Sequence, residues 1–341
     1  MKELSIGAKH SCFVIAEIGM NHNGDLDLAK AMIKSAAECG ASAVKFQIFK
    51  AEKFVAENAL VYGENSHSEP VSQVEMLKKY EFSYDDWELL KDTAAKEGII
   101  FFASVFDEES LNIVDSLDVE LFKIASCDLT NLPLIKQIGR CGKATFLSTG
   151  MSTLSEIDIA VRTFLKTANR NLVLMHCISS YPANIADSNI AVIQSLQTAF
   201  GLPVGFSDHC KENYASFGAV VLGSVAIEKH FTIDNKLPGI DQEMSLNPEE
   251  FAKLVEGIKA IRKSIGVSTK TVLESEKPAR TNGRRSIMAS CDIPVGVIIN
   301  QKMLTIKRPG TGLSPIYYDF IIGKKASQLI KKDELLTWEK L

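Results

Sequence analysis

LFKIASCDLTNLPLIKQIGRCGKATFLSTG, residues 121–150, shows how this chain is built. It begins with a short apolar run at 121–124 and ends with a second one at 144–147. Between them, residues 131–138 carry apolar side chains at the three- and four-residue spacing of an amphipathic helix. Two short apolar runs joined by a helix are typical of a parallel strand–helix–strand unit.

The same unit recurs along most of the chain. Strands are expected at 11–18, 42–48, 99–103, 121–124, 144–147, 172–175, 204–206 and 225–228, followed by helices at 25–39, 84–96, 107–117, 131–138, 155–165, 188–199, 213–222 and 248–265. Eight such units predict an α/β fold of the (β/α)₈ TIM-barrel type. A doubly wound open sheet is the alternative, but eight units are many for that fold, and no GxGxxG follows the first strand.

Two segments depart from this rhythm. Residues 49–83 form a long polar stretch, which predicts a functional lid with a helix near 71–80. After residue 265 the chain becomes polar and loop-like, and from residue 284 it shows short strands punctuated by Pro and Gly. We therefore expect a catalytic barrel at 1–265, a linker at 266–283 and a small, mostly β domain at 284–341.

The composition is that of an ordinary globular protein. Of 341 residues, 46% are hydrophobic and 23% are charged, and the formal net charge is −4. No run of one charge indicates a nucleic-acid surface, and the apolar runs are too short to span a membrane. The first residues lack the apolar stretch of a signal peptide, and the seven cysteines occur singly, without a CxxC pair. This pattern predicts reduced, mostly core thiols in a cytoplasmic protein.

Chemistry in a (β/α)₈ barrel lies at the carboxyl ends of the strands. Polar side chains occur at all eight of these ends: Glu17; Lys45 and Gln47; Ser104; Lys123, Ser126 and Asp128; Ser148; His176, Ser179, Ser180 and Tyr181; Ser207, Asp208 and His209; Glu228 and His230. Polar loops explain part of this pattern. Polar loops do not explain Lys45 and Lys123, which lie inside apolar strands. Burying a lysine there is costly unless its ammonium group contacts an anion or a carboxylate. One such lysine would indicate a structural ion pair, whereas two on different strands, beside serines, favour an anion site for phosphate and carboxylate.

His209 and His230 lie one strand–helix unit apart, so neighbouring strand ends are expected to carry them. A single histidine is more often a core or helix-end residue than a ligand. Two on adjacent strand ends, with Glu17, Glu228 and Asp241 available, raise the prospect of a divalent-metal site. Nitrogen and oxygen ligands would suit Mn²⁺, Fe²⁺, Co²⁺ or Mg²⁺.

An ordered set of motifs resembles the sialic acid synthase family over almost the whole chain. The motifs are IAEIGMNHNGD (15–25), VKFQ (44–47), FKIAS (122–126), LSTGM (147–151), HCISSYP (176–182), GFSDH (205–209), EKHF (228–231) and KRPGTG (307–312). Single pieces such as STG are weak signals, but the set in this order is highly specific. The tail from residue 284 resembles the antifreeze-like SAF domain of these synthases.

The resemblance implies an enzyme that condenses phosphoenolpyruvate with an N-acetylated amino-sugar aldehyde, either N-acetylmannosamine or a 2,4-diacetamido-trideoxyhexose. The product would be a nine-carbon sialic-acid-type 2-keto sugar acid, with release of phosphate. The resemblance also implies a divalent metal, Mn²⁺ foremost and Mg²⁺ or Co²⁺ as alternatives, held by His209 and His230. A domain-swapped homodimer is implied as well, in which Arg308 of the tail reaches the barrel of the partner subunit.

The family's roles fall on matching residues of this sequence. Phosphoenolpyruvate binding is implied for Lys45, Ser104, Lys123, Ser126, Ser148 and Ser207; catalysis for Glu17, Lys45, Lys123 and Asp128; and acceptor binding for Phe106, Tyr181, Glu228, Asp241 and Arg308.

The chain departs from the family pattern in two places. ASVF at 103–106 stands where STPF is usual, and SCD at 126–128 stands where SGE is usual. Asp128 is one methylene shorter than Glu, which shifts its carboxylate by about 1.5 Å, so the identity of the acceptor stays open. The IGM version of the first motif favours a sialic- or legionaminic-type acceptor over a pseudaminic one.

Two other functions compete with this interpretation. A metal-independent barrel aldolase would use Lys45 or Lys123 as a Schiff-base nucleophile. An inactive barrel retained as a binding protein would explain the two altered motifs.

Overall fold

The chain folds into two compact units, Met1–Gly266 and Val267–Leu341. The computed structural model describes residues 11–57 and 72–341. Each unit has a hydrophobic core of its own.

The first unit is a closed (β/α)₈ barrel, which confirms the predicted fold class. Eight parallel strands pair in chain order, and β8 pairs with β1 to close the ring. This closure excludes the doubly wound open sheet, which has two free edges. The strands are β1 (Phe13–Gly19), β2 (Ala43–Ile48), β3 (Ile100–Val105), β4 (Leu121–Ile124), β5 (Ala144–Ser148), β6 (Leu172–Cys177), β7 (Val204–Asp208) and β8 (Ala226–His230).

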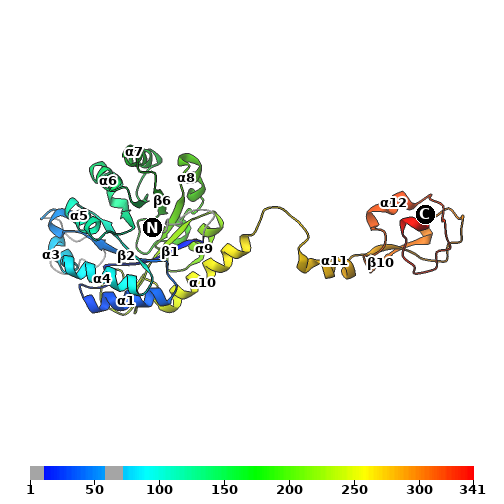
Figure 1. Cartoon of the computed structure of the whole chain (residues 1–341), viewed down its shortest axis with the longest axis horizontal. Coiled ribbons are helices and arrows are strands. Elements are labelled where there is room, and N and C mark those ends of the chain that lie inside the picture. The colour runs from blue at the N-terminus through cyan, green and yellow to red at the C-terminus, as the bar shows by residue number, and fades with distance from the viewer. Residues whose placement is uncertain (1–10, 58–71) are drawn as a thin grey trace. The chain divides into compact units, whose positions relative to one another are not determined.

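Helices surround the ring of strands (Figure 1). Local sequence signals start several of them. The Asp25 carboxylate accepts hydrogen bonds from the backbone N–H groups of Asp27 and Leu28 and so caps α1. Ser83 and Asp86 form a capping box at the start of α4. The helices of this unit are α1 (Leu26–Glu38), α2 (Ala51–Phe54), α3 (Gln73–Lys78), α4 (Tyr84–Lys96), α5 (Glu108–Ser116), α6 (Leu132–Arg140), α7 (Leu154–Leu165), α8 (Val192–Phe200), α9 (Tyr214–Val221) and α10 (Pro248–Ile265).

Six strands end later than their apolar runs predicted, and β3, β6, β7 and β8 do so by two residues. The expected ends of β6, β7 and β8 were residues 175, 206 and 228, and the strands end at Cys177, Asp208 and His230. Backbone pairing with the neighbouring strands continues through these polar residues, because it does not depend on the side chain. His230 consequently lies on a strand, in register with Glu17 of β1.

Apolar side chains fill the barrel interior below the strand ends. Phe102 and Phe146 lie in this cluster, with ring centroids 5.9 Å apart. The other buried members are Ile15, Ala43, Leu121, Val173, Met175, Val225 and Ala226. Lys45 is in register with Phe102 on the neighbouring strand, so the polar layer rests directly on an apolar floor. A charge placed there loses its water and needs a partner of opposite sign.

The described parts of the predicted lid segment contain the two short helices α2 and α3. The helix expected near 71–80 is α3. Below these helices, the rings of Phe54 and Phe106 lie 4.6 Å apart, and Phe49 packs beside both. Residues 58–71, which hold the rest of the predicted lid, lie outside the described residues.

The second unit is small and mostly irregular, and its sheet has two antiparallel strands, β9 (Ser286–Ala289) and β10 (Leu304–Lys307). Its core consists of aliphatic side chains, including Ile287, Ile293, Ile299, Ile330 and Leu336. The short helix α12 (Tyr318–Ile321) packs on this core through Ile321. The predicted linker at 266–283 is not all loop, because the helix α11 (Lys277–Gly283) occupies its last part.

Two simpler expectations can be compared with the structure. All seven cysteines are free thiols, and Cys12, Cys177 and Cys210 are buried, but Cys127 and Cys291 are exposed rather than in a core. In the described part of the chain, no helix is long and apolar enough to cross a membrane.

Candidate active site

Lys45 lies in a buried polar cluster at the carboxyl end of the barrel. Its Nζ is 2.7 Å from Oε2 of Glu17 and 3.6 Å from Oε1 of Glu228. It also donates a hydrogen bond of 3.0 Å to Oγ of Ser104. Glu17 and Lys45 are register partners on β1 and β2, so barrel pairing brings this ion pair together. The other oxygen of Glu17 accepts a hydrogen bond of 3.2 Å from Nε2 of Gln47.

Lys123 reaches the same cluster from β4. Its Nζ lies 2.8 Å and 2.7 Å from the two carboxylate oxygens of Glu228 on β8. Ser207 of β7 donates a hydrogen bond of 3.0 Å to Oε1 of Glu228. Glu228 thus joins β2, β4, β7 and β8 across the barrel. The cluster contains two lysines and two carboxylates, so its formal charges cancel in the free protein, which offsets the cost of burying them.

Electrostatics inside the cluster favour the charged forms of Glu228 and Lys45, whereas burial lowers the pKa of Lys123 despite its contact with Glu228. Burial on its own would raise the pKa of Glu228, but Lys123 and Lys45 hold this pKa well below its usual range. Burial on its own would lower the pKa of Lys45, but Glu17 and Glu228 raise it above the usual value. Lys45 is therefore a fixed cation at neutral pH rather than a neutral amine.

The two predicted metal-ligand histidines face each other across neighbouring strand ends. The ring centroids of His209 and His230 are 5.6 Å apart, and the Tyr181 ring lies 4.2 Å from that of His209. Burial lowers the pKa of His209 to about 3, so its imidazole is neutral at pH 7. Its Nδ1 lies 2.6 Å from the carbonyl oxygen of Ile178, to which it donates, so a lone pair remains on Nε2.

His230 is held less completely. Its Nδ1 is buried and has no hydrogen-bond partner within the described residues, and the closest carboxylate oxygen to it is Oδ2 of Asp241, at 3.6 Å. Glu17 is the register partner of His230 on β1. Over the described ranges, no three His, Cys, Asp or Glu side chains form a group that could hold a metal ion by themselves.

A second polar group lies at the ends of β4, β5 and β6. Oγ of Ser126 accepts a hydrogen bond of 3.1 Å from the backbone N–H of Gly150 and lies 3.1 Å from Sγ of Cys177. A Cβ at Gly150 would lie only 2.3 Å from Oγ of Ser179 and 2.8 Å from Oγ of Ser126, so a side chain there would displace both hydroxyl groups. Ser148 is buried at the end of β5, and Oγ of Ser179 is buried with no partner among the described residues.

Sequence reasoning did not assign a role to several residues of these groups, namely Gln47, Gly150, Cys177 and Ser179. For Gln47 a signal exists, because it follows Lys45 by two residues and so faces the same side of β2. Gly150 and Cys177 carry no such signal, because their role depends on which loops the barrel brings together.

The remaining predicted residues make other contacts. Asp128 is buried, burial raises its pKa, and its carboxylate accepts a hydrogen bond of 3.0 Å from Nδ2 of Asn131. Phe106 is part of the aromatic cluster with Phe54. Arg308 belongs to the second unit, where its Nε donates to the carbonyl of Gly283, and its contact with a partner barrel stays a prediction.

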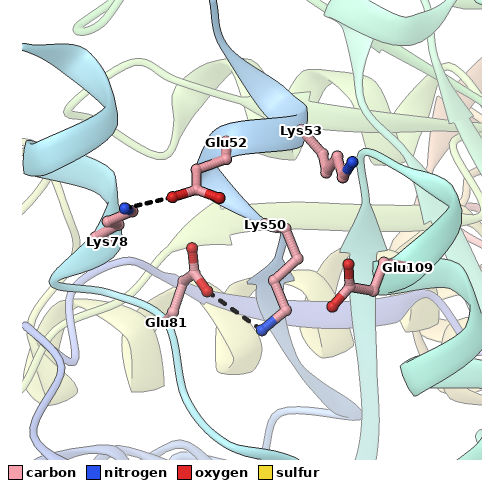
Figure 2. A pocket seen from close by; sticks show the side chains of 6 residues that line it. All are labelled: Lys50, Glu52, Lys53, Lys78, Glu81 and Glu109. Atoms are coloured by element: carbon pink, nitrogen blue, oxygen red, sulfur yellow. Dashed lines mark hydrogen bonds and ion pairs between the residues drawn. The ribbon is translucent and has the colours of Figure 1, made fainter. Parts of the chain in front are cut away.

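A cavity of about 420 Å³ lies over α2, α3 and α5 (Figure 2). Three lysines and three glutamates line it: Lys50, Lys53, Lys78, Glu52, Glu81 and Glu109. Two ion pairs, Lys50–Glu81 at 3.2 Å and Lys78–Glu52 at 2.5 Å, already connect four of them. Glu81 also accepts a hydrogen bond from the backbone N–H of Ala51 at the start of α2. The charged side chains that line the cavity therefore stabilise α2.

Comparisons with known proteins identify the family of this chain. Residues 32–270 match the NeuB family, and residues 284–341 match the SAF domain. The chain is 40% identical over 339 residues to the N,N'-diacetyllegionaminic acid synthase of Legionella pneumophila, which covers 98% of this chain and 95% of that protein. It is 35% identical over 337 residues to the N-acetylneuraminate-9-phosphate synthase of Homo sapiens, covering 98% of this chain and 94% of that protein.

A solved structure gives the same result. The crystal structure of the N-acetylneuraminic acid synthetase of Leptospira borgpetersenii matches with a TM-score of 0.73 and 40% identity, over 82% of this chain and 93% of that one. A family match over most of the chain and relatives of this identity at nearly full length show its membership. The chain belongs to the NeuB family, the sialic acid synthase family that its motifs resemble.

Proposed function

We propose that this protein condenses phosphoenolpyruvate with an N-acetylated amino-sugar aldehyde to a nine-carbon sialic-acid-type 2-keto sugar acid and releases phosphate. The observation that carries the proposal is the buried cluster in which Lys45 and Lys123 converge from β2 and β4 on Glu17 and Glu228. Its relatives in the NeuB family include enzymes named as synthases of such acids.

Phosphoenolpyruvate would bind where the two lysines and the serine hydroxyls meet. The two ammonium groups would contact its carboxylate and phosphate, and Ser104, Ser126 and Ser148 would donate hydrogen bonds. Ser207 would donate as well, once its hydroxyl turns away from Glu228. Because Glu17 and Glu228 hold the lysines in place before the substrate arrives, the cations need little reorganisation when it binds. Preorganised charges of this kind in a dry site are effective in stabilising a transition state.

The donor set also fits a divalent cation, which we propose to be Mn²⁺, with Mg²⁺ or Co²⁺ as alternatives. The fit rests on the neutral imidazole of His209 and on the unpartnered, buried Nδ1 of His230. Two imidazoles leave positions for water or substrate oxygens, with Asp241 and Glu17 beside them. When bound there, such an ion supplies a Lewis acid that polarises the acceptor aldehyde.

The chain's own residues would serve the remaining steps. The methylene carbon of phosphoenolpyruvate forms a bond to the aldehyde carbon, and the aldehyde oxygen takes up a proton and becomes a hydroxyl. Water then adds to the positively charged enol carbon, and the Glu17 carboxylate accepts the proton that the water loses. The bond from this carbon to the phosphate oxygen breaks, and the phosphate leaves with the electron pair. The hydroxyl group on the carbon gives its proton to the phosphate, so the carbon becomes a ketone. Glu17 returns its proton to solvent, which balances the proton that the aldehyde oxygen took up. Lys45 and Lys123 stay near the leaving phosphate and stabilise its charge.

We propose that Tyr181, Asp241, Glu228, Phe106 and Arg308 bind the acceptor, and that Asp128 serves catalysis beside it. Tyr181 and Asp241 lie beside the two histidines, which is where the aldehyde end would be held. Asp128 and the Phe106 ring lie on the side of β3 and β4, and would contact the rest of the sugar. We further propose that Arg308 acts from the partner subunit of a homodimer.

A Schiff-base aldolase is less compatible with the site. Lys45 is held as a cation by two carboxylates. Burial lowers the pKa of Lys123, but its Nζ lies within 2.8 Å of both oxygens of Glu228, which hold it in an ion pair. A nucleophilic amine needs a free lone pair.

The test measures phosphate release from phosphoenolpyruvate with Mn²⁺, with N-acetylmannosamine and 2,4-diacetamido-2,4,6-trideoxymannose offered separately. We expect release with one acceptor, loss of release with a chelator, and loss in the Lys45→Met variant. Lys143→Met, which removes a lysine paired with Asp118 at the amino end of β5, should leave the rate unchanged. Failure of the protein to bind phosphoenolpyruvate would overturn the proposal.

A further inference from the structure

A second buried ion pair lies on the outer side of the same two strands that carry the histidines. Asp208 of β7 and Lys229 of β8 are register partners, and Nζ of Lys229 is 3.1 Å from Oδ2 of Asp208. Their side chains are only 0% and 2% exposed. Neither residue belongs to the proposed substrate or metal site.

Side-chain alternation explains why this pair faces outward. Ser207 and Glu228 point into the barrel, where they are hydrogen-bonded to each other. His209 and His230 also point inward, with their rings 5.6 Å apart. Successive side chains on a strand point to opposite faces, so a residue next to these in sequence points toward the helices. Asp208 lies between Ser207 and His209, and Lys229 lies between Glu228 and His230. The side chains of Asp208 and Lys229 therefore point outward, toward the helices.

The pair forms a complete hydrogen-bond network. Besides Asp208, the ammonium of Lys229 donates to the carbonyl oxygen of Cys210 and, at 2.9 Å, to that of Glu212. The Asp208 carboxylate accepts from the backbone N–H of Cys210 at 2.9 Å and from Oγ of Ser216 on α9 at 2.6 Å. We call these residues, Asp208, Cys210, Glu212, Ser216 and Lys229, the outer clamp. It connects β8 to the loop that begins immediately after His209.

Stability alone does not account for such a pair, because well-packed apolar side chains in its place are often equally stable. The outer clamp instead fixes the position of the β7–α9 loop relative to β8. Lys229 has three acceptors in fixed positions, so the β7–α9 loop and β8 cannot shift against each other without breaking a buried hydrogen bond. The orientation of the His230 ring depends most on the outer clamp, because its buried Nδ1 has no hydrogen-bond partner in the described part of the chain.

We propose that the Asp208–Lys229 pair is a positioning device that fixes His209 and His230 at the separation needed for a divalent cation. The inference rests on the proposed role of these histidines as ligands. Asp208 and Lys229 are positioning residues, not catalytic ones, since they act through their neighbours. Partners that orient metal ligands typically change metal affinity by about 10–100-fold when removed.

The experiment uses the full chain and Mn²⁺ alone as the probe, followed by titration calorimetry. Lys229→Met by itself leaves a buried carboxylate unpaired and could fail to fold. The main variant is therefore the double substitution Asp208→Asn with Lys229→Met, which removes both charges and keeps the side-chain volumes. The matched control is Val161→Ala on α7, which destabilises a buried core position away from the histidines.

We expect the double variant to bind Mn²⁺ about 10–100-fold more weakly, while Val161→Ala binds it as the parent does. Phosphoenolpyruvate binding without metal should stay within about threefold, since Lys45 and Lys123 are unchanged. Equal Mn²⁺ affinity in the double variant and the parent would overturn the proposal, and so would an equal loss in the control.

A second readout separates this inference from the proposed function. In protein with isotope-labelled histidine rings and no metal, the double variant should shift the signals of His209 and His230 but not that of His22. If the parent chain binds no Mn²⁺, the ligand assignment fails, and the ring signals alone decide whether the pair positions the histidines. If the parent binds Mn²⁺ but releases no phosphate with either acceptor, the proposed reaction fails while the positioning role is still measured.

Discussion

Lys123 and Glu228 show how strongly a single residue of this barrel depends on its partner. Both are almost completely buried, and the lysine contacts both carboxylate oxygens. An ion pair in this position contributes little net stability, but removing one member leaves the other charged and without water.

We expect Lys123→Met to lower the free energy of unfolding by about 3 kcal/mol and to abolish phosphate release. The double variant Lys123→Met with Glu228→Leu should regain most of this stability but no activity. Both charges of the ion pair are then absent, so neither is left buried without its partner. Urea unfolding of the two variants, beside phosphate release, measures this. Equal stability of the single and the double variant would contradict the ion-pair argument.

His22 is a titratable residue with a structural role. It is fully buried in a cage of aromatic rings formed by Phe46, Tyr80, Phe82 and Trp87. Its Nδ1 accepts a hydrogen bond of 3.1 Å from the backbone N–H of Gly24. Burial lowers its pKa from 6.5 to about 4. As the pH falls below 6.5, the unfolded chain takes up a proton that folded His22 does not, so stability is lost between pH 6.5 and about 4.

We expect the free energy of unfolding to fall by about 1.2 kcal/mol from this residue between pH 6 and pH 5. His22→Gln should remove that part of the slope whatever it does to stability at pH 7. Trp87→Phe alters the same cage without a titratable group and should leave the slope as it is. Urea unfolding at pH 7, 6 and 5 gives the slopes, and an unchanged slope in His22→Gln would refute the assignment.

At the scale of elements, the loop after β1 is tied to the loop after β8. Nδ2 of Asn21 donates to the carbonyl of Phe231 at 2.9 Å and to Oγ of Ser245 at 2.8 Å. Gln242 in turn donates to the carbonyl of Asn21 at 2.7 Å, and Ser245 to that of Asp241 at 2.6 Å. This network holds the loop that places Asp241 beside His230.

We expect Asn21→Ala to raise the acceptor KM by about tenfold, roughly the value of one or two lost hydrogen bonds, with a smaller effect on the KM for phosphoenolpyruvate. The control is Asn169→Ala, which removes a similar buried side-chain bond to the carbonyl of Lys143 at the amino end of the barrel. It should cost stability without changing the acceptor KM. Steady-state kinetics with each substrate varied in turn checks both, and equal KM changes for the two substrates would argue against a role in the acceptor site.

At the scale of the whole molecule, the chain has two units with separate cores. The proposed homodimer divides each active site between a barrel from one chain and Arg308 from the other. Exchange of an element between identical subunits is a common way to build such a dimer.

Complementation between two inactive variants tests this arrangement. Lys123→Met disables the barrel, and Arg308→Ala disables the tail. When both chains are produced together in equal amounts, half of the dimers contain one of each, and each mixed dimer has one intact site of two. We expect about a quarter of the parent activity in the mixture and almost none in either variant alone. Arg308→Lys, which keeps the charge, is the control for the tail.

No recovery in the mixture, with both variants folded and dimeric, would mean that Arg308 does not act across the dimer. Dimer formation itself is checked by light scattering on the full chain.

The sequence by itself determined the architecture, and it predicted which residues form the candidate site. Alternating apolar runs and helical segments predicted the barrel, because strand and helix periods are set locally by which side chains must be buried. Residues at strand ends predicted the site, because parallel strands in a barrel all end on one face. Lys45 and Lys123 stood out within that set because a charged side chain in an apolar strand is costly to bury without a partner.

Only the tertiary structure decided which of these residues meet. Lys123 and Glu228 are 105 residues apart in sequence, and closure of the ring, not local pattern, brings them within 2.8 Å. The sequence placed Glu228 in the acceptor site, while the structure shows it bonded to both substrate-site lysines. The outer clamp was likewise not visible, because an Asp and a Lys at strand ends look like site residues until alternation and register show that they face the helices. The two-residue alternation along a strand fixes the face on which a side chain lies. Its contact partners depend on strand register and barrel closure, which are properties of the whole fold.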